Sequence, residues 1–360
     1  MNPCLHSQLT KYPKMQPVDL VKLLFQREFV GGHMAMDAAQ NLARIETECA
    51  GLPPFSGDAF EDIGGGLCRL HLGTLRSIDL TPAAVNRLFM ATSAAVTGSL
   101  ARFEALLNEL LDSCRKGELP FDYAELEKYI SGYCAQGCPP VSHSADYSKA
   151  YAPAYRVVKS AYVRIIGVFR RIDALMDTGK TVTVAIDGSS GAGKSSLAAL
   201  LAEVYDCNVF HMDHFFLPQA RKTEARLSEA GGNVDYERFG REVIEGLKGG
   251  GAFSYHIFDC AAQSLDTVQV TPKKLNIIEG VYSLHPSLGD PYDLKIFLET
   301  GGSEQRSRIL LRNGADMLAR FETEWIPLEN RYFDALQIRT RCDLVFGAQL
   351  VLDETRASCL

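Results

Sequence analysis

The feature that most constrains this chain is a glycine-rich turn between a strand pattern and a helix pattern in residues 181–203. Residues 181–186 alternate β-branched with small apolar side chains, and residues 197–203 are strong helix formers. The turn between them has the spacing G-x-x-x-x-G-K-S/T, which forms a phosphate-binding loop when a strand precedes it and a helix follows it. The sequence therefore predicts a nucleoside triphosphate site.

The residues of this turn offer different contacts to a phosphate group. Gly188, Gly191 and Gly193 can take positive φ, which turns the backbone N–H groups inward at the positive end of the next helix. Lys194 adds a charge for the β- and γ-phosphates, and the Ser195 hydroxyl can bind Mg²⁺. ATP and Mg²⁺ are the predicted cofactors, and a turn that binds nothing is the weaker alternative. The predicted phosphate-binding residues are Gly188, Ser189, Ser190, Gly191, Ala192, Gly193, Lys194, Ser195 and Ser196.

Composition and charge argue against several kinds of partner. A 360-residue chain with 46% hydrophobic and 22% charged residues suits two soluble domains. The net charge of −7 and the lack of a Lys/Arg run argue against nucleic acid, and no apolar run is long enough to predict a membrane span. Scattered cysteines and a start without a signal-peptide pattern predict a cytoplasmic location. The sequence leaves open whether the chain forms a homo-oligomer.

Residues 1–152 predict a mainly helical domain of unknown role. Thr81 followed by Pro82 is a typical helix start, and Asp122 with Glu125 resembles a capping box. The predicted helices cover residues 18–26, 34–49, 82–115 and 123–134, and residues 61–72 predict a turn and a strand.

The segment 138–156 has the prolines of a linker but is unusually rich in tyrosine and other hydrogen-bonding side chains. One interpretation is that His143 and His33 line a second ligand site. The other, which we favour from the sequence, is a polar seam between two domains. A helix predicted over residues 155–176 then leads into the second domain, residues 153–360.

Two carboxylates follow buried strand patterns in this second domain. Asp213 comes directly after a strand ending at Met212, and Glu279 ends the strand pattern that begins at Lys274. In an open parallel α/β sheet the carboxyl ends of the strands face the ligands. Asp213 is therefore the predicted catalytic base, with a helix cap as its alternative role, and Glu279 is predicted to act at Mg²⁺ with Ser195.

Arginines follow the last core strand pattern, on a helix predicted over residues 304–313. Cationic side chains at this position can neutralise charge on a transferring phosphoryl group. Arg308 and Arg312 are the predicted catalytic arginines, and the alternative is a solvated helix face.

The order of these motifs resembles the uridine kinase family of P-loop kinases. After the phosphate loop come Asp213-His-Phe-Phe216, Phe258-Asp259 and Glu279-Gly-Val-Tyr282, and the resemblance covers residues 180–348. Phosphoribulokinases, pantothenate kinases and nicotinamide riboside kinases share much of this plan. The resemblance implies a doubly wound parallel sheet with helices on both faces, and it implies the same roles for Lys194 and the other predicted site residues.

The resemblance also implies an acceptor site and shows two departures. Asp235 and Tyr236 match the segment that follows the lip of the acceptor site in the family. Uridine kinases carry an arginine shortly after the Phe258-Asp259 position, where this chain has Gln263-Ser264-Leu265. The lid is also short and leads to Trp325, the only tryptophan, for which core packing is favoured over capping the acceptor pocket.

The sequence therefore predicts an ATP-dependent kinase that phosphorylates a hydroxyl group of a small metabolite, with a uridine- or cytidine-like nucleoside as the first expectation. One alternative is a non-nucleoside acceptor, such as a pantothenate-like compound, a sugar or a sugar acid. Another is a nucleotide-dependent switch whose output is the N-terminal half. A third is a bifunctional enzyme in which His33 and His143 serve separate chemistry.

Overall fold

The computed structural model describes residues 3–32, 37–53, 55, 57–259 and 264–347. Contacts within the chain divide it into two units, with the boundary between Arg164 and Ile165. Each unit has its own secondary structure and its own core, so each is described separately. None of the helices in the described ranges combines the length and the apolar composition that a bilayer-spanning helix needs.

The first unit combines helices with a small antiparallel sheet. The sheet has the order β1-β2-β3. Its strands are β1 (Phe60–Gly64), β2 (Leu67–His71) and β3 (Tyr155–Lys159). The helices are α1 (Pro3–Lys11), α2 (Pro17–Phe29), α3 (Ala38–Gly51), α4 (Pro82–Ala95), α5 (Leu100–Arg115), α6 (Tyr123–Ala135), α7 (Ala145–Tyr151) and α8 (Ser160–Arg164).

The helix predicted over residues 82–115 is in fact two helices, α4 and α5. Thr81 caps α4 by accepting from the Ala84 N–H at 3.1 Å, as the sequence indicates. The backbone becomes extended at Val96, and Ser99 then caps α5 through the Arg102 N–H. Val96 is β-branched and Ser99 is a good capping residue. Together they end one helix and start the next, although the apolar spacing continues through both.

The helix predicted over residues 155–176 is wrong in its first part. Tyr155 to Lys159 form β3, which pairs antiparallel with β2, and α9 begins only at Ile166. Three consecutive buried residues in this strand, including Val157 and Val158, suit an extended backbone packed on both faces. Pairing with β2 makes this segment part of the first unit.

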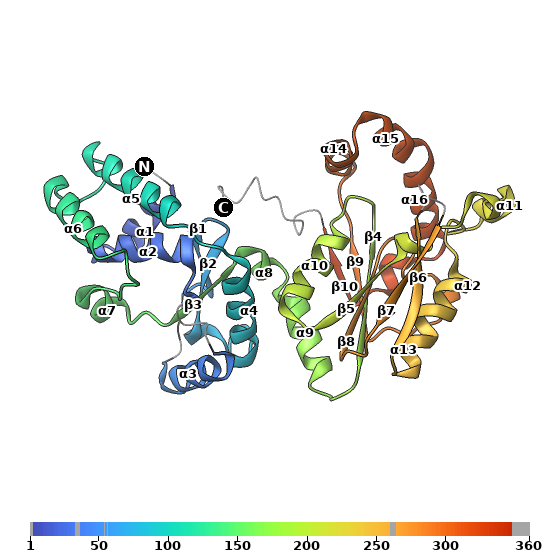
Figure 1. The fold of residues 1–360 in the computed structure, drawn as a ribbon, viewed down its shortest axis with the longest axis horizontal. Coiled ribbons are helices and arrows are strands. Elements are labelled where there is room, and N and C mark those ends of the chain that lie inside the picture. The colour runs from blue at the N-terminus through green and yellow to red at the C-terminus, as the bar shows by residue number, and fades with distance from the viewer. Residues whose placement is uncertain (1–2, 33–36, 54, 56, 260–263, 348–360) are drawn as a thin grey trace. The chain divides into compact units, whose positions relative to one another are not determined.

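The second unit is built on a five-stranded parallel sheet with the order β10-β9-β4-β8-β5. Its strands are β4 (Val182–Gly188), β5 (Cys207–His211), β8 (Leu275–Glu279), β9 (Leu294–Leu298) and β10 (Leu344–Phe346). Helices α9 (Ile166–Met176) and α10 (Lys194–Val204) cover one face, and α12 (Tyr236–Phe239) and α13 (Glu245–Gly249) lie on the other side (Figure 1). The predicted doubly wound parallel sheet is confirmed.

The second unit also contains a small hairpin and further helices. A separate antiparallel hairpin consists of β6 (Phe253–Asp259) and β7 (Ser264–Val270). The other helices are α11 (Glu224–Ser228), α14 (Gly302–Asn313), α15 (Ala315–Arg320) and α16 (Ile326–Ala335). One π-helical turn joins α12 to α13, and another, Phe321–Trp325, joins α15 to α16.

Candidate functional site

The phosphate loop connects the central strand β4 to α10. Gly188, Gly191 and Gly193 have φ values of 139°, 73° and 97°, a range that favours glycine. A Cβ on Gly188 would lie 1.9 Å from the Leu298 carbonyl oxygen of the neighbouring strand. The glycines therefore have the backbone conformations that the motif predicts, and Gly188 also allows a close approach to β9.

Lys194 lies against the loop. Its ammonium group donates to the carbonyl oxygens of Gly188 at 2.9 Å and Ser189 at 3.0 Å, and the residue is buried. These bonds keep a buried charge solvated by backbone dipoles. They also hold the ammonium group where the loop can present it to phosphate oxygens.

Asp187, immediately before the loop, is a site residue that the sequence analysis missed. It is fully buried and accepts from the backbone N–H groups of Gly188 at 2.7 Å and Leu284 at 3.0 Å. The Tyr332 hydroxyl donates to the same carboxylate at 2.7 Å. Burial raises the pKa of Asp187 despite these bonds, which lower it. Asp187 thus ties the loop to the chain after β8 and to α16.

The predicted Mg²⁺ ligands lie next to each other. The Ser195 hydroxyl donates to Glu279 Oε1 at 3.1 Å, and His211 contacts the same oxygen from the end of β5. The parallel register sets Glu279 opposite both Ile186 and His211, so three neighbouring strands meet here. His211 was not predicted, and nothing local in the sequence distinguishes it.

A hydroxyl and a carboxylate oxygen are the hard ligands that Mg²⁺ prefers, so Ser195 and Glu279 fit this ion. In the described parts of the chain, no three His, Cys, Asp or Glu side chains gather in a way that could hold a metal ion by themselves.

Asp213 follows β5 and is exposed to solvent at the carboxyl edge of the sheet. Desolvation by the surrounding protein raises the pKa of this carboxyl group. The Lys194 charge acts to lower the pKa, and the Glu279 charge acts to raise it further. An accessible carboxylate that is influenced by both of these residues lies close to the loop. Its position suits proton acceptance from a substrate hydroxyl.

Arg308 and Arg312 are on the same helix, α14, but have different surroundings. Arg308 donates to the Gly191 carbonyl oxygen at 3.1 Å and pairs with Glu304. Arg312 is exposed and bonds to Asn313, and its charge partly opposes the rise in the pKa of Asp213. The structure thus connects Arg308 to the loop and brings Arg312 within electrostatic reach of Asp213.

Helix α16 supplies a second unpredicted contact with the loop. Glu329 is 4% exposed and accepts from the Ser190 N–H at 2.9 Å, while its other oxygen contacts the Ser190 hydroxyl. Gln305 donates to the Ser190 carbonyl oxygen at 2.9 Å from α14. Burial raises the pKa of Glu329, and the Lys194 charge opposes that shift. Ser190 is therefore held on both of its backbone polar groups.

The segment with Asp235 and Tyr236, which matches the one that follows the acceptor lip in the family, lies beside α16. Asp235 is buried, pairs with Arg221 and caps α12 through the Arg238 N–H. The Tyr236 ring stacks on His285 at a centroid distance of 4.0 Å, and His285 is stacked 6.0 Å from Tyr332. We call residues 228–236 and His285 the acceptor wall.

Two departures from the family pattern have different outcomes. Gln263 lies outside the described residues, whereas Ser264 begins β7 and Leu265 is exposed on it. Trp325 packs edge-on against Phe321 at 4.5 Å, and Arg320 lies over its ring at 5.0 Å. Trp325 therefore packs locally, beside the start of α16.

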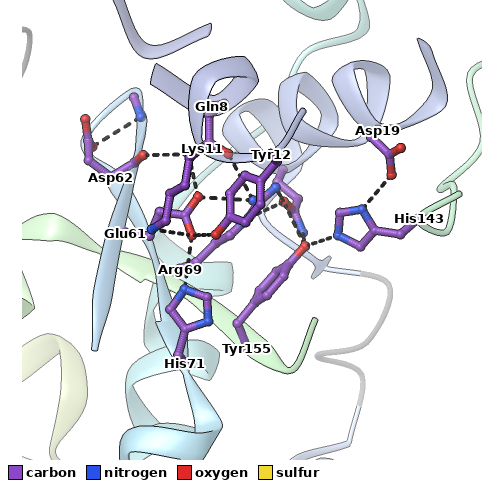
Figure 2. A network of polar contacts seen from close by, with 12 residues as sticks. Gln8, Lys11, Tyr12, Asp19, Glu61, Asp62, Arg69, His71, His143 and Tyr155 are labelled. Atoms are coloured by element: carbon purple, nitrogen blue, oxygen red, sulfur yellow. Dashed lines mark hydrogen bonds and ion pairs between the residues drawn. The ribbon is translucent and has the colours of Figure 1, made fainter. Parts of the chain in front are cut away.

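The first unit contains a buried polar network. Figure 2 shows His143 between Asp19 and Tyr155, with distances of 2.8 Å to the Asp19 carboxylate and 2.6 Å to the Tyr155 hydroxyl. Burial lowers the pKa of His143, although its bond to Asp19 acts against this. For Asp19 burial acts to raise the pKa, but bonds from His143, Ser144 and Gln16 outweigh it and lower the pKa.

Arg69 and Glu61 form the other half of this network (Figure 2). Arg69 is completely buried, lies over the Tyr155 ring, and contacts Glu61 at 3.4 Å. Burial alone would raise the pKa of Glu61, but His71, Arg69 and hydrogen bonds from Tyr12 and Gln8 together lower it to about 2. The network is charged, and its partners come from separate segments of the first unit.

These contacts bear on both interpretations of segment 138–156. His33 lies outside the described residues. The prediction that His33 and His143 line one ligand site therefore stays a prediction. The contacts of His143, Ser144 and Tyr155 described above are all made with other residues of the first unit. The segment therefore contributes to the core of this unit, and the polar seam that we favoured from the sequence stays a prediction.

Comparisons with known proteins give structural matches that each cover about half of this chain. No protein-family model matches the chain. A candidate fructose transport system kinase from Silicibacter sp. is 27% identical, matches 52% of this chain and 98% of its own, and has a TM-score of 0.40. A possible uridine kinase from Bacillus stearothermophilus is 20% identical, matches 50% of this chain and 99% of its own, and has a TM-score of 0.37. The N-terminal half is unmatched.

Proposed function

We propose that this protein is an ATP-dependent, Mg²⁺-requiring kinase that transfers the γ-phosphoryl group to a hydroxyl group of a small metabolite. The observation that carries the proposal is the position of Asp213. This accessible carboxylate lies at the carboxyl edge of the sheet, with Lys194 and Glu279 close enough to influence its pKa. A nucleotide switch needs the loop and the metal ligands but has no use for such a base.

In the proposed reaction the protein mainly positions groups and neutralises charge. The loop N–H groups and Lys194 bind the phosphates, and Mg²⁺, when bound by Ser195 and Glu279, supplies further neutralisation. Asp213 orients the acceptor hydroxyl and accepts its proton. Arg308 holds the loop at Gly191, and Arg312 is the exposed cation available to the transferring group.

A nucleoside is the first acceptor to test. Asp235 and Tyr236 support this choice, because they match the segment that follows the lip of the acceptor site in uridine kinases. Ser264 and Leu265 argue against a standard nucleoside site, since they stand near the position of the expected arginine. A pantothenate-like, sugar or sugar-acid acceptor is therefore the alternative within the same mechanism.

The test is phosphoryl transfer from γ-labelled ATP with Mg²⁺ into pooled nucleosides, vitamins, sugars and sugar acids. Wild type is compared with Lys194→Ala and Asp213→Asn. We expect label in one acceptor and its loss in both variants. Label in uridine or cytidine identifies a nucleoside kinase. Label in another compound keeps the proposed mechanism but assigns a different acceptor. Release of inorganic phosphate alone, at the same rate in the Asp213 variant, would favour the nucleotide switch and overturn the kinase proposal.

A further inference from the structure

Helix α16 contacts the phosphate loop through two side chains one helical turn apart. Tyr332 donates to Asp187 immediately before the loop, and Glu329 accepts from the backbone and hydroxyl of Ser190 within it. Residues at positions i and i+3 share one face of a helix. A movement of α16 along or away from this face would therefore change both contacts together.

The same helix is also packed against the acceptor wall. Arg331 donates to the Ser228 carbonyl oxygen at 3.3 Å, and Tyr332 is stacked with His285. His285 in turn stacks on Tyr236 and contacts the Ala230 carbonyl oxygen at 3.0 Å. The helix is thus a direct physical connection between the nucleotide loop and residues 228–236.

The Ser190 N–H and hydroxyl donate to the two oxygens of Glu329, which favours an ionised carboxylate, and that charge makes its contact with the loop sensitive to bound phosphate. The carboxylate is buried, hydrogen-bonded to a loop N–H group and influenced by the Lys194 ammonium group. A nucleotide brings several negative charges to this loop and competes for the Lys194 charge. Repulsion between charges is strong where water is excluded, so we expect bound phosphate to weaken the contact between Glu329 and Ser190.

We propose that Glu329 is a positioning residue through which nucleotide binding at the loop shifts α16 and, with it, the acceptor wall. The inference rests on the nucleotide binding of the proposed function and extends it to regulation of the same site. Such coupling is reciprocal. Bound acceptor therefore changes the affinity for nucleotide by the same factor by which bound nucleotide changes the affinity for acceptor. The rival explanation is a static brace, in which Glu329 only holds Ser190 in place.

Trp325 provides a direct measurement because it is the only tryptophan and immediately precedes α16. Purified full-length protein is titrated with Mg²⁺ and a non-hydrolysable ATP analogue. Calorimetry measures binding, Trp325 emission reports the start of α16, and hydrogen exchange reports residues 228–236. In wild type we expect binding to change both the emission and the exchange of the acceptor wall.

Glu329→Gln separates charge from geometry, because the amide can still accept from the Ser190 N–H and donate to its hydroxyl. We expect this variant to bind the analogue about 3- to 10-fold more tightly, with a smaller change in Trp325 emission, because the like charge is gone. Asp334→Asn is the matched control, since it removes an exposed carboxylate from the same helix. We expect its affinity and emission change to match wild type.

The outcomes separate this inference from the proposed function. Binding in wild type with no change in emission or exchange would show a static brace and overturn the inference alone. Identical behaviour of Glu329→Gln and wild type would do the same. If calorimetry detected no nucleotide binding at all, the proposed function would fall and the inference with it.

Discussion

The buried network of the first unit and the candidate site of the second use similar side chains in opposite ways. In the network, Glu61 and Arg69 are buried and contact each other as well as neutral partners. In the candidate site, Asp213 and Arg312 remain exposed at the edge of the sheet. From this difference we expect that charges left accessible beside a phosphate loop, rather than charge density alone, mark the binding site.

The difference also has an energetic side. A buried ion pair contributes little compared with apolar packing, but removing one partner leaves an uncompensated charge and is strongly destabilising. An accessible catalytic charge can be removed with little effect on folding and a large effect on rate. Substitutions in the two regions should therefore produce opposite patterns of stability and activity.

The largest expected effect is on activity, at Asp213. Asp213→Asn should lower kcat by roughly 10²–10⁴-fold, because the amide cannot accept the substrate proton. The unfolding midpoint should stay close to that of wild type, since the side chain is exposed. Steady-state kinetics on the labelled acceptor and urea unfolding measure the two quantities. A variant with an unchanged rate would remove Asp213 from its proposed role.

The next effect is on stability, at Glu61. Glu61→Gln should destabilise the first unit by about 3–5 kcal/mol, because Arg69 remains buried without its carboxylate. Far-UV circular dichroism follows both units during urea unfolding, whereas Trp325 emission follows the second unit. We expect the circular dichroism transition to show the lost stability. A double variant that also replaces Arg69 with Met should recover part of this stability. No recovery would show that the unpaired Arg69 is not the cause of the loss.

A smaller effect is expected from pH. The folded-state pKa of Glu61 is lowered from 4.5 to about 2, so the ionised carboxylate stabilises the folded unit above pH 4.5. That contribution, on the order of 3 kcal/mol, is lost as pH falls from about 4.5 toward 2. Urea unfolding between pH 5 and 2 measures the slope. Glu61→Gln should flatten it, and an equally steep slope in the variant would assign the acid sensitivity to other groups.

The phosphate loop and the two carboxylates at the sheet edge, Asp213 and Glu279, could be predicted from the sequence because their signals are local. The loop motif spans consecutive residues, and the carboxyl ends of parallel strands meet at one edge, which brings Glu279 beside Ser195. Glu329 and Tyr332 could not be found in this way, because they lie 139 and 145 residues from their partners Ser190 and Asp187. Nothing near them in the chain indicates those contacts.

The wrong helix at residues 155–159 has a similar cause. Its apolar residues fit a helical spacing, but pairing with β2, whose residues 67–71 are distant in sequence, makes it a strand. The same pairing inserts Tyr155 into the polar network, which the sequence showed only as a segment rich in tyrosine and histidine. Long-range strand pairing thus determines both the secondary structure of residues 155–159 and the contacts of Tyr155.

The smallest expected effect comes from an ion pair that matches Glu61 and Arg69 in chemistry but not in burial. Asp112 and Arg115, one helical turn apart in α5 of the same unit, are 2.7 Å apart with side chains 59% and 60% exposed. Exposed pairs of this kind gain little because water and salt screen them. Asp112→Asn should therefore leave the urea midpoint unchanged within error, in the same assay that detects Glu61→Gln. A comparable loss at both positions would mean that burial is not what separates the network from ordinary surface charge.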